Sequence, residues 1–580
     1  MKNSWVTKSQ GLKVTKSACL CVMVALCLFL VPQLAQAATY YLDAVNGSDS
    51  NAGDSAHPWK TLAKALSVNR AGSTVKMATG DYGILYINNS YQTDYLTFAA
   101  SDGATPRIRL LDVSFGAKAN AYLRFEGINF QAEPGDDTEH CAYANGKRNI
   151  YLQFADYVYF KSCAIHNVGP GTSNAYDGDE WIPYDCAFMI NSCNNVTLDN
   201  CTLVPDGIMD RPGKRGGISG SASTNINIIN STIDGNSVGI TVKGSGYNIT
   251  HNEIKNIWSA GINMNGSDVT IQDCDIHDIY LPPGAGFHND GINIFGANIT
   301  NFIFRRNIIR RSNAHAIMCN DWQGGTPPDN MLFENNLIYD NNMTVDPATA
   351  QTVAGISNPN YCWHMDDVNP PTNVKLINNT VIGCLRIHSL TFAQVTGNII
   401  AYINPDSGAS APHWTTWDYN VVGCWAVAHD GVGSHDTTLH ANEAWESTVS
   451  TSFLHGALFK NAANKDFTLG SSSIARDLVP LASSTTLDIN GVTRSGTDYD
   501  AGCYEYGVES AVMYGDVDGN GEVSAYDAAL TAQAAVGLIT LTAEQIQAAD
   551  VSGEGEVSAY DAALIAQKAV GLINRFPVES

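Results

Sequence analysis

Residues 284–296, GAGFHNDGINIFG, place two side chains that could transfer protons, His288 and Asp290, just before an alternating apolar segment. Imidazole and carboxylate groups are common general acids and bases in enzymes. The same stretch is compatible with a corner of a repetitive fold, where polar residues and glycine turn the chain. The choice between these interpretations depends on the elements that position the two residues.

Two short acidic segments carry a sharper chemical pattern. Residues 515–539 and 549–573 are identical at 20 of 25 positions, with oxygen-bearing residues at loop positions 1, 3, 5, 9 and 12 and glycine at position 6. This spacing surrounds a hard cation with oxygen and is typical of Ca²⁺ loops, whose position 7 contributes a backbone carbonyl. The predicted ligands are Asp516, Asp518, Asn520, Glu522, Ser524 and Asp527 in the first loop, and Asp550, Ser552, Glu554, Glu556, Ser558 and Asp561 in the second.

Each loop ends in aspartate at position 12, where glutamate is usual, and leads into one alanine-rich segment. This duplicated loop and helix, at 515–574 after a linker at 508–514, resembles a type I dockerin. The resemblance implies two structural Ca²⁺ ions, and a cohesin domain of a scaffold or surface protein as partner. Ser552 and Glu554 make the second loop the less regular site. Ala525-Tyr526 and Ala559-Tyr560 stand where many dockerins have Ser/Thr pairs, which leaves the choice of cohesin open.

A longer repeat fills residues 195–400. Apolar residues at alternate positions lead to an asparagine-like residue and then to another apolar residue, and a second short strand such as Gly239-Ile240-Thr241-Val242 follows most copies. Alternation predicts strands with one face inward, and a polar residue at a fixed offset predicts a repeated turn. Units of 20 to 43 residues without helical periodicity predict a parallel β-solenoid. A β-sandwich is the alternative, but its hairpin signals are missing.

Neighbouring coils of a solenoid lie about 4.8 Å apart, so their residues can be compared in columns. The column before the second strand contains Val238, Ala260, Asp290 and His315, which predicts that Asp290 and His315 are neighbours. Other coils turn this corner without an acid. The corner therefore does not require Asp290, and the sequence favours a catalytic site over a structural hydrogen-bonded pair.

Long connecting segments are expected at the same corner, where loops on a rigid scaffold often carry function. Aromatic rings can stack on sugars while carboxylates and bases move protons. The predicted catalytic residues are Asp290, His315, His288, Arg215, Lys214 and Asp210, and the predicted substrate-binding residues are Trp322, Asp321, Trp181 and Trp363. A further Ca²⁺ ion in this cleft is also expected, because a cation can neutralise the carboxylate of a uronate.

A second column of charged residues allows two interpretations. Lys255, His277 and Arg310 could supply a base and charge neutralisation for a lyase. Arg311 stands between Asp278 and Asp340 in sequence register, which is typical of a salt-bridge ladder on a solenoid surface. The ladder is the favoured interpretation, since runs of charge usually form solvated faces.

The flanks carry a family resemblance. Residues 38–43, ATYYLD, the segment NGSDSNAG at 46–53, and DAGCYEY at 500–506 are similar to the N-terminal cap and closing segment of secreted right-handed parallel β-helix proteins. The resemblance implies the pectate-lyase-like superfamily, whose characterised members mostly cut or bind polysaccharides. It places a β-helix domain at 38–507, with a cap at about 38–110, coils at about 120–405 and a closing segment at about 406–507.

The N-terminus and the composition limit the compartment and the partners. Lysines precede an apolar run at 18–31 and a small-residue cleavage pattern, Ala35-Gln36-Ala37, so residues 1–37 are predicted to be a secretory signal peptide. No other stretch is apolar and long enough to span a membrane. A net charge of −25 argues against nucleic acid as a partner. Cys163, Cys201 and Cys274 share one coil position and are expected to pack as thiols.

The sequence therefore predicts a secreted carbohydrate-active protein, a polysaccharide lyase or a glycoside hydrolase, which cohesin holds at the cell surface or in a multi-enzyme complex such as a cellulosome. In a hydrolase, Asp290 and a loop carboxylate such as Asp210 or Asp321 would be acid and base. In a lyase, Lys214, Arg215, His288 or His315 would supply the base. The alternative is a non-catalytic carbohydrate-binding or structural β-helix displayed by the same dockerin.

Overall fold

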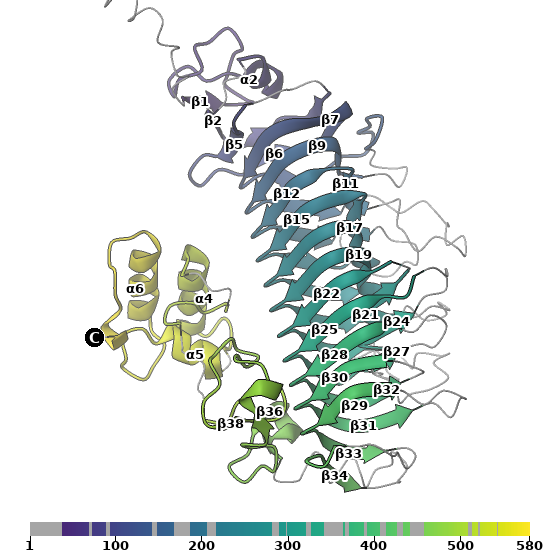
Figure 1. Cartoon of the computed structure of the whole chain (residues 1–580). Helices are drawn as coiled ribbons and strands as arrows, with labels where there is room; N and C mark the ends of the chain where they lie inside the picture. The colour runs from purple at the N-terminus through teal and green to yellow at the C-terminus, as the bar shows by residue number, and fades with distance from the viewer. Residues whose placement is uncertain are drawn as a thin grey trace, which may run out of the picture.

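The computed structural model describes residues 38–68, 72–88, 93–141, 148–167, 186–205, 216–280, 289–296, 298–320, 326–341, 363–365, 371–387, 391–405, 413–425, 433–440, 458–507, 513–519, 523–541 and 543–579. Its main body is a stack of coils whose neighbouring strands pair in parallel in one continuous sheet of 34 strands. The coils run from the purple top to the green bottom of Figure 1, and the small C-terminal helical region lies beside them. The parallel pairing confirms the predicted solenoid and excludes the β-sandwich.

Each coil contributes to three ladders, which we call sheets 1, 2 and 3 in the order in which a coil enters them. Sheet 1 comprises β1 (Thr39–Leu42), β2 (Thr74–Met77), β5 (Leu96–Ala100), β7 (Leu110–Glu126), β9 (Ile150–Lys161), β12 (Asn194–Asp199), β15 (Ser223–Ile229), β17 (Val238–Thr250), β19 (Ala260–Gln272), β22 (Thr300–Arg305), β25 (Asp329–Glu334), β28 (Thr372–Ile377), β30 (Thr391–Thr396) and β32 (His413–Asp418).

Sheet 2 comprises β3 (Gly80–Asp81), β6 (Pro106–Ile108), β8 (Asn129–Phe130), β10 (Ala164–Asn167), β13 (Thr202–Pro205), β16 (Thr232–Asp234), β18 (Glu253–Ile257), β20 (Asp275–Ile279), β23 (Ile308–Ser312), β26 (Leu337–Tyr339), β29 (Thr380–Ile387), β31 (Ile399–Pro405), β33 (Val421–Trp425) and β34 (Thr437–His440). Sheet 3 comprises β4 (Ile84–Ile87), β11 (Cys186–Asn191), β14 (Gly216–Ser221), β21 (Asp290–Phe295), β24 (Ile317–Asn320) and β27 (Trp363–Met365), together with the first halves of β7, β9, β17 and β19 and the second halves of β29, β31 and β33.

Alternating side chains fill the interior. In β17, Ile240 and Val242 belong to the buried core while Thr241 and Lys243 lie on the opposite face of the strand. The same alternation in β19 buries Ile262 and Met264. Stacking of equivalent positions therefore builds one continuous apolar core along the coil axis, which no coil could form alone.

The corner between sheets 1 and 2 is built from a repeated pair of residues. The first has a left-handed backbone, as at Asn335 (φ 53°) and Asn378 (φ 54°), which confirms the predicted turn. The next residue points inward, and in the C-terminal coils it is asparagine. Asn336 Nδ2 donates to Asn379 Oδ1 at 2.9 Å and to the carbonyl of Phe304 at 2.9 Å, and its Oδ1 accepts from the Asn307 backbone at 3.0 Å. The ladder comprises Asn307, Asn336, Asn379, Asn398 and Asn420, all buried.

In earlier coils this inward column carries other small residues. Cys163 and Cys201 align through the pairing of β10 with β13, and Cys274 precedes β20 at the same corner. All three thiols are buried, which confirms the predicted column, and burial raises the pKa of Cys274 to about 12. Such thiols are unreactive packing groups.

The parallel pairing continues past the predicted end of the coils at 405, because β32, β33 and β34 still pair with preceding strands. In this last part Trp414 and Trp417 replace the usual aliphatic residues, which hides the repeat from inspection of the sequence. Residues 458–507 then fold back along the corner between sheets 1 and 2. They contain two antiparallel pairs, β35 (Phe459–Asn461) with β36 (Asp466–Leu469), and β37 (Val479–Pro480) with β38 (Asp498–Tyr499).

The helices lie at the two ends of the chain. Among the described residues, one helix belongs to the N-terminal cap and three belong to the C-terminal region, and short 3-10 turns occur in the last part of the chain. The helices are α2 (Leu62–Val68), α4 (Ala525–Ala535), α5 (Ala543–Ala549) and α6 (Ala559–Ala569), and the 3-10 turns are η1 (Ala462–Asn464), η2 (Leu481–Ser483) and η3 (Pro577–Glu579).

We predict that Asn336→Ala destabilises the β-helix strongly. It removes two donated hydrogen bonds and leaves the Asn307 backbone donor buried without its acceptor, and each such group costs about 1–3 kcal/mol. The midpoint of urea unfolding should fall by an amount equivalent to at least about 2 kcal/mol. Asn227→Ala is the matched control, since this β15 side chain makes one long hydrogen bond, 3.4 Å, to Thr197 on the outer surface. Equal effects of the two substitutions would contradict a structural role for the ladder.

Candidate functional site

The outer face of sheet 3 carries a column of polar side chains. Ser219, Thr241, Asn263 and Asn293 are register partners on β14, β17, β19 and β21. Each is at most 2% exposed, although it points away from the core. Figure 1 shows these strands stacked on the right-hand side of the solenoid.

These buried side chains have unused hydrogen-bonding capacity. Among the described residues, the Oγ atom of Ser219, Oγ1 of Thr241 and the Oδ1 atoms of Asn263 and Asn293 have no hydrogen-bond partner. An unpaired buried polar atom is costly, and structures rarely tolerate several in a row. These hydroxyl and amide oxygens recur on four adjacent coils. A ligand with many hydroxyl groups could donate hydrogen bonds to them.

Asp290 and His315 lie at the edge of this column. His315 Nδ1 and Asp290 Oδ1 are 2.9 Å apart, which confirms the prediction that these residues are neighbours on adjacent coils. Asp290 is 1% exposed, and its second oxygen, Oδ2, has no partner. The ring of His364, from the next coil, lies 5.4 Å from that of His315.

Backbone contacts hold this pair in place. The amide of Asp290 donates to the carbonyl of Ser259 and the amide of Gly291 to the carbonyl of His315, both at 2.9 Å. Ser312 Oγ bridges the carbonyls of Asn289 and His315 at 3.0 and 2.7 Å. The carboxylate and the imidazole are therefore fixed relative to each other before any ligand arrives.

Such a pair can act in acid–base chemistry. A carboxylate that accepts from Nδ1–H selects the imidazole tautomer in which Nε2 is the proton acceptor. The same contact stabilises the imidazolium that forms after proton transfer. The geometry is compatible with catalysis and does not assign a reaction.

The structure describes only part of the predicted site. Asp290, His315 and Trp363 lie within the described residues. His288, Lys214, Arg215, Asp210, Asp321, Trp322 and Trp181 lie outside them, so their roles stay predictions. Residues 1–37, predicted as a signal peptide, also lie outside.

One predicted binding residue is wrong. Trp363 belongs to the apolar core inside the coils and packs against Phe333, with ring centroids 4.9 Å apart, so its ring faces away from the outer surface where a substrate would stack. Its neighbour His364 occupies the outward position instead, since Met318 and His364 are register partners in the polar column. The sequence Trp-His-Met alternates inward and outward, and the tryptophan takes the inward position.

The polar column on the outer face of sheet 3 was not predicted from the sequence. Its signal was present, since the outward position after the first isoleucine of the second strand is occupied by serine, threonine and asparagine in successive coils. Alternation predicts that these side chains point outward, and polar residues are common on an outer surface. Their burial, which makes them unusual, depends on the three-dimensional surroundings.

The second charged column forms an ion-pair network. Arg311 binds Asp278 through two hydrogen bonds of 2.6 Å, and Arg310 binds Asp275 at 2.5 Å. His277 lies 2.6 Å from Asp278 and 3.2 Å from Glu253. These pairs support the ladder interpretation, although Asp340 pairs with Lys465 of the closing segment rather than with the Arg311 side chain.

The network shifts the pKa of its members. Burial opposes ionisation of Asp278, but hydrogen bonds from Arg311, His277 and Tyr280 outweigh it and hold the pKa well below its usual value. The hydrogen bond from His277 is the main cause that lowers the pKa of Glu253 to about 2. Burial lowers the pKa of His277, but its bonds to Asp278 and Glu253 raise it overall. The opposite charges of this network therefore pair with one another.

The first acidic loop of the C-terminal region gathers three carboxylates. Oxygens of Asp516, Asp518 and Asp527 lie within 4.8 Å of one another. Asp527 is fully buried, accepts from the backbone amides of Val517 and Asp518 at 2.8 and 3.0 Å, and caps α4 together with Ser524. Carboxylate oxygens gathered in this way are the ligands that Ca²⁺ prefers, so the residues present fit the predicted ion. Asn520 and Glu522 lie outside the described residues.

The second loop is arranged differently. Asp550 accepts the backbone amides of Gly553, Glu554 and Gly555, and Ser558 caps α6 with Asp561. Ser552 Oγ donates to Asp550 at 3.2 Å, and Glu554 and Glu556 are exposed. Among the described residues, the first loop is the one place with three metal-ligating side chains together, so neither the second loop nor the outer face of sheet 3 gathers a comparable set.

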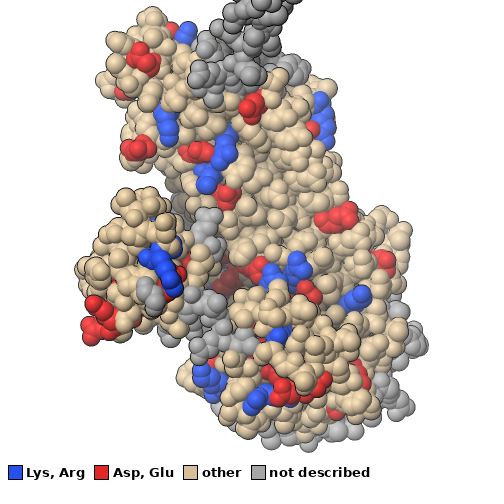
Figure 2. Space-filling model, turned by 60° about the vertical axis from the view of Figure 1, so that its left-hand side comes forward, with Lys and Arg blue, Asp and Glu red and all other residues tan. Residues whose placement is uncertain are grey.

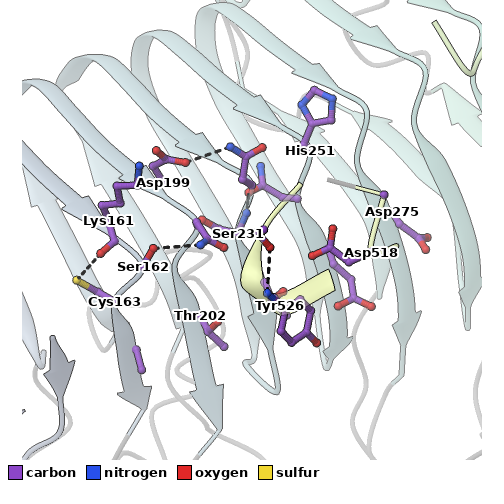
Figure 3. Close-up of a pocket in the computed structure, with 18 of the residues that line it drawn as sticks. Lys161, Ser162, Cys163, Asp199, Thr202, Ser231, His251, Asp275, Asp518 and Tyr526 are labelled. Atoms are coloured by element: carbon purple, nitrogen blue, oxygen red, sulfur yellow. Dashed lines mark hydrogen bonds between the residues drawn. The ribbon is translucent and has the colours of Figure 1, made fainter. Parts of the chain in front are cut away.

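A cleft separates the C-terminal region from the solenoid. Its volume is about 730 Å³, and the lining includes Asp275 and His251 of the solenoid with Asp518 and Tyr526 of the first loop and α4. Figure 2 shows this hollow with acidic side chains at its floor, and Figure 3 shows the side chains that face it. Tyr526 remains 61% exposed at the edge of the cleft. It is a gap between two domains and lies at a different edge from Asp290.

Family models match three segments of the chain. Residues 216–404 match a right handed beta helix region, residues 514–568 match a dockerin type I domain, and residues 45–85 match a protein family of unknown function. A search of curated proteins finds no match. No helix among the described residues is long and apolar enough to cross a membrane.

Solved structures with a similar fold differ widely in sequence. A rhamnogalacturonan lyase has 15% identity and a TM-score of 0.34, covering 71% of this chain and 90% of its own. XylC, in a complex with xylose, has 11% identity and a TM-score of 0.41, covering 81% and 98%. The surface protein and adhesin PfbA of Streptococcus pneumoniae has 13% identity and a TM-score of 0.33, covering 64% and 93%. At these values no activity is transferred from them.

The charged network predicts a pH dependence of stability. Because the pKa of His277 is raised on folding, protonated His277 stabilises the folded chain. This stabilisation is complete below the pKa of the unfolded chain, about 6.5, and is lost as the pH rises through the pKa of the folded chain. The Asp278 and Glu253 contributions are complete above about pH 4.5 and are lost as the pH falls. We expect the melting temperature to decline above about pH 6.5, and His277→Gln to flatten this decline. His251→Gln, on the same flank, should leave it unchanged. An unchanged profile in the His277 variant would exclude the coupling.

The different arrangement of the two loops predicts that they bind Ca²⁺ with different affinities. We expect titration calorimetry to show two sites, with Asp518→Ala abolishing the tighter one and Asp561→Ala the weaker one. EDTA should unfold α4 and α6, seen as lost helical ellipticity, and should abolish binding to a type I cohesin. Asp102→Ala, an exposed acid of the β-helix, is the control. Cohesin binding that survives complete chelation would contradict the Ca²⁺ assignment.

Proposed function

We propose that this chain, which carries a right-handed β-helix and a type I dockerin, is a secreted polysaccharide-degrading enzyme that cohesin holds on a scaffold or surface protein. The observation that carries the proposal is the column of buried, unpartnered polar atoms from Ser219 to Asn293 beside the Asp290–His315 pair. The dockerin supplies attachment, and the outer face of sheet 3 supplies the substrate site.

The column suits a linear carbohydrate. Sugar hydroxyls both donate and accept hydrogen bonds, so they can satisfy serine, threonine and asparagine side chains alike. Coils about 4.8 Å apart repeat these groups along the solenoid axis. A chain of sugar rings laid along the axis would meet one polar side chain per coil.

The acid–base pair would act on the bound chain. In a lyase, Nε2 of His315 takes the C5 proton of a uronate, the electrons form the C4–C5 double bond, and the glycosidic oxygen leaves from C4 and is protonated. In a hydrolase, Asp290 and a second carboxylate, Asp210 or Asp321, would activate water and protonate the leaving oxygen. In both reactions Asp290 maintains the orientation of His315.

The direct test is a panel of acidic and neutral polysaccharides incubated with the full chain. Absorbance near 235 nm reports unsaturated uronates, and reducing ends without that absorbance report hydrolysis. We expect cleavage, and we expect His315→Gln and Asp290→Asn to lower kcat by about 10²- to 10⁴-fold, the usual contribution of a general acid or base. His251→Gln is the control.

Two results would contradict catalysis by this pair. Binding of a glycan without any product would favour the non-catalytic β-helix. Cleavage that is indifferent to both substitutions would place the catalytic residues elsewhere.

A further inference from the structure

Lys243 stands on the outer face of sheet 3, two residues along β17 from Thr241 of the polar column. On β17, Ile240 and Val242 point into the core, so Thr241 and Lys243 point outward together. Asn265 is the register partner of Lys243 on the next coil, just as Asn263 is the partner of Thr241. Lys243 therefore lies next to the unpartnered atoms described above.

This lysine has no anionic partner in the part of the chain that the structure describes. It forms no ion pair and no hydrogen bond through Nζ, in contrast to the arginines of sheet 2, which each bind a carboxylate. Burial lowers the pKa of its half-buried ammonium group, and no neighbouring charge offsets this effect. In a chain of net charge −25, such a cation surrounded by neutral groups is unusual.

The surroundings of Lys243 are selective for negative charge. The neighbouring outward positions hold Ser219, Thr241, Asn263 and Asn265, which are neutral hydrogen-bonding groups. Asp290, at the edge of the polar column two coils away, is engaged with His315. An anionic group of a sugar bound here would accept a charge-assisted hydrogen bond from Nζ of Lys243. The hydroxyls of the same sugar chain would bind the neighbouring serine, threonine and asparagine side chains.

We propose that Lys243 is the specificity-determining residue of the substrate face and binds the anionic group of an acidic sugar, either a uronate carboxylate or a sulfate ester. This inference rests on the proposed function, since it places the ligand on the same face. It adds that the substrate is acidic at the coil of β17, two coils from Asp290 along the column.

The test uses affinity electrophoresis of the full chain in gels that contain paired polysaccharides. Polygalacturonate is paired with its fully methyl-esterified form, and a sulfated galactan with its desulfated form, so each pair differs in charge and not in backbone. We expect retardation by an acidic member and much weaker retardation by its neutral partner. The pair that responds identifies the carboxylate or the sulfate ester as the ligand.

Substitutions assign the effect to this side chain. Lys243→Met keeps the length of the side chain and removes the charge, and it should weaken binding roughly tenfold or more, as expected for one hydrogen bond to a charged group. Lys243→Arg should retain the preference for the acidic member. Lys375→Met, which removes an outward lysine from β28 of sheet 1, is the matched control and should bind as the wild type does.

A stability measurement separates binding from misfolding. An amine whose pKa falls on folding destabilises the folded chain wherever the unfolded chain binds its proton, that is, below about pH 10.4. Lys243→Met should therefore melt at the same temperature as the wild type or higher. A structural lysine would give the opposite result.

The outcomes distinguish the two proposals. Equal binding of acidic and neutral members, or full binding by Lys243→Met, would overturn the role of Lys243 and leave a carbohydrate-binding face in place. Retardation by neither member of any pair would overturn both the role of Lys243 and the proposed function.

Discussion

The structure depends on the need to satisfy backbone and side-chain polar groups at a buried corner that recurs in every coil. A left-handed residue turns the chain, and the following inward residue must then pair with the coils above and below. Asparagine does this with both ends of its amide, as Asn379 does between Asn336 and Asn398. Because each amide bridges two coils, the ladder fixes the register and separation of the coils from Asn307 to Asn420, while parallel backbone pairing aligns the outward columns along the whole stack.

This alignment makes the contrast between the faces meaningful. On sheet 2, acids and bases from neighbouring coils meet and neutralise each other, as Arg311 and Asp278 do. On sheet 3, equivalent geometry brings together hydroxyls and amides that do not satisfy one another, and a lysine, Lys243, that pairs with no acid in the described part of the chain. Stacking of coils produces both faces. The polar atoms of sheet 3 differ from the structural ladder on sheet 2 because they lack hydrogen-bond partners among the described residues, as expected of a ligand site.

The sequence predicted what periodicity controls. Alternation located the strands, the asparagine-like residue located the left-handed turn, and the column comparison brought Asp290 beside His315. It did not predict which of two adjacent aromatic residues faces inward at Trp363-His364, because a single residue of register reverses the two faces. It also did not predict that Thr241 and Asn263 are buried, since burial of an outward residue depends on segments far away in sequence. The end of the coils near 440 was missed because aromatic residues replaced the aliphatic pattern.

The closing segment has a consequence for the order in which the chain folds. Hydrogen bonds of the ladder join residues 19 to 43 positions apart, whereas Arg494 reaches back 159 positions to Asn335, and Thr485 accepts from Asn335 across 150. Coils can therefore assemble one after another as local events, while the seal over their edge must wait for the last part of the domain. A chain released early would keep its coils but would expose Leu337, Ile399 and Val421, which this segment covers. Docking of this segment is thus the step that completes the domain, because it buries the apolar edge that the coils leave open.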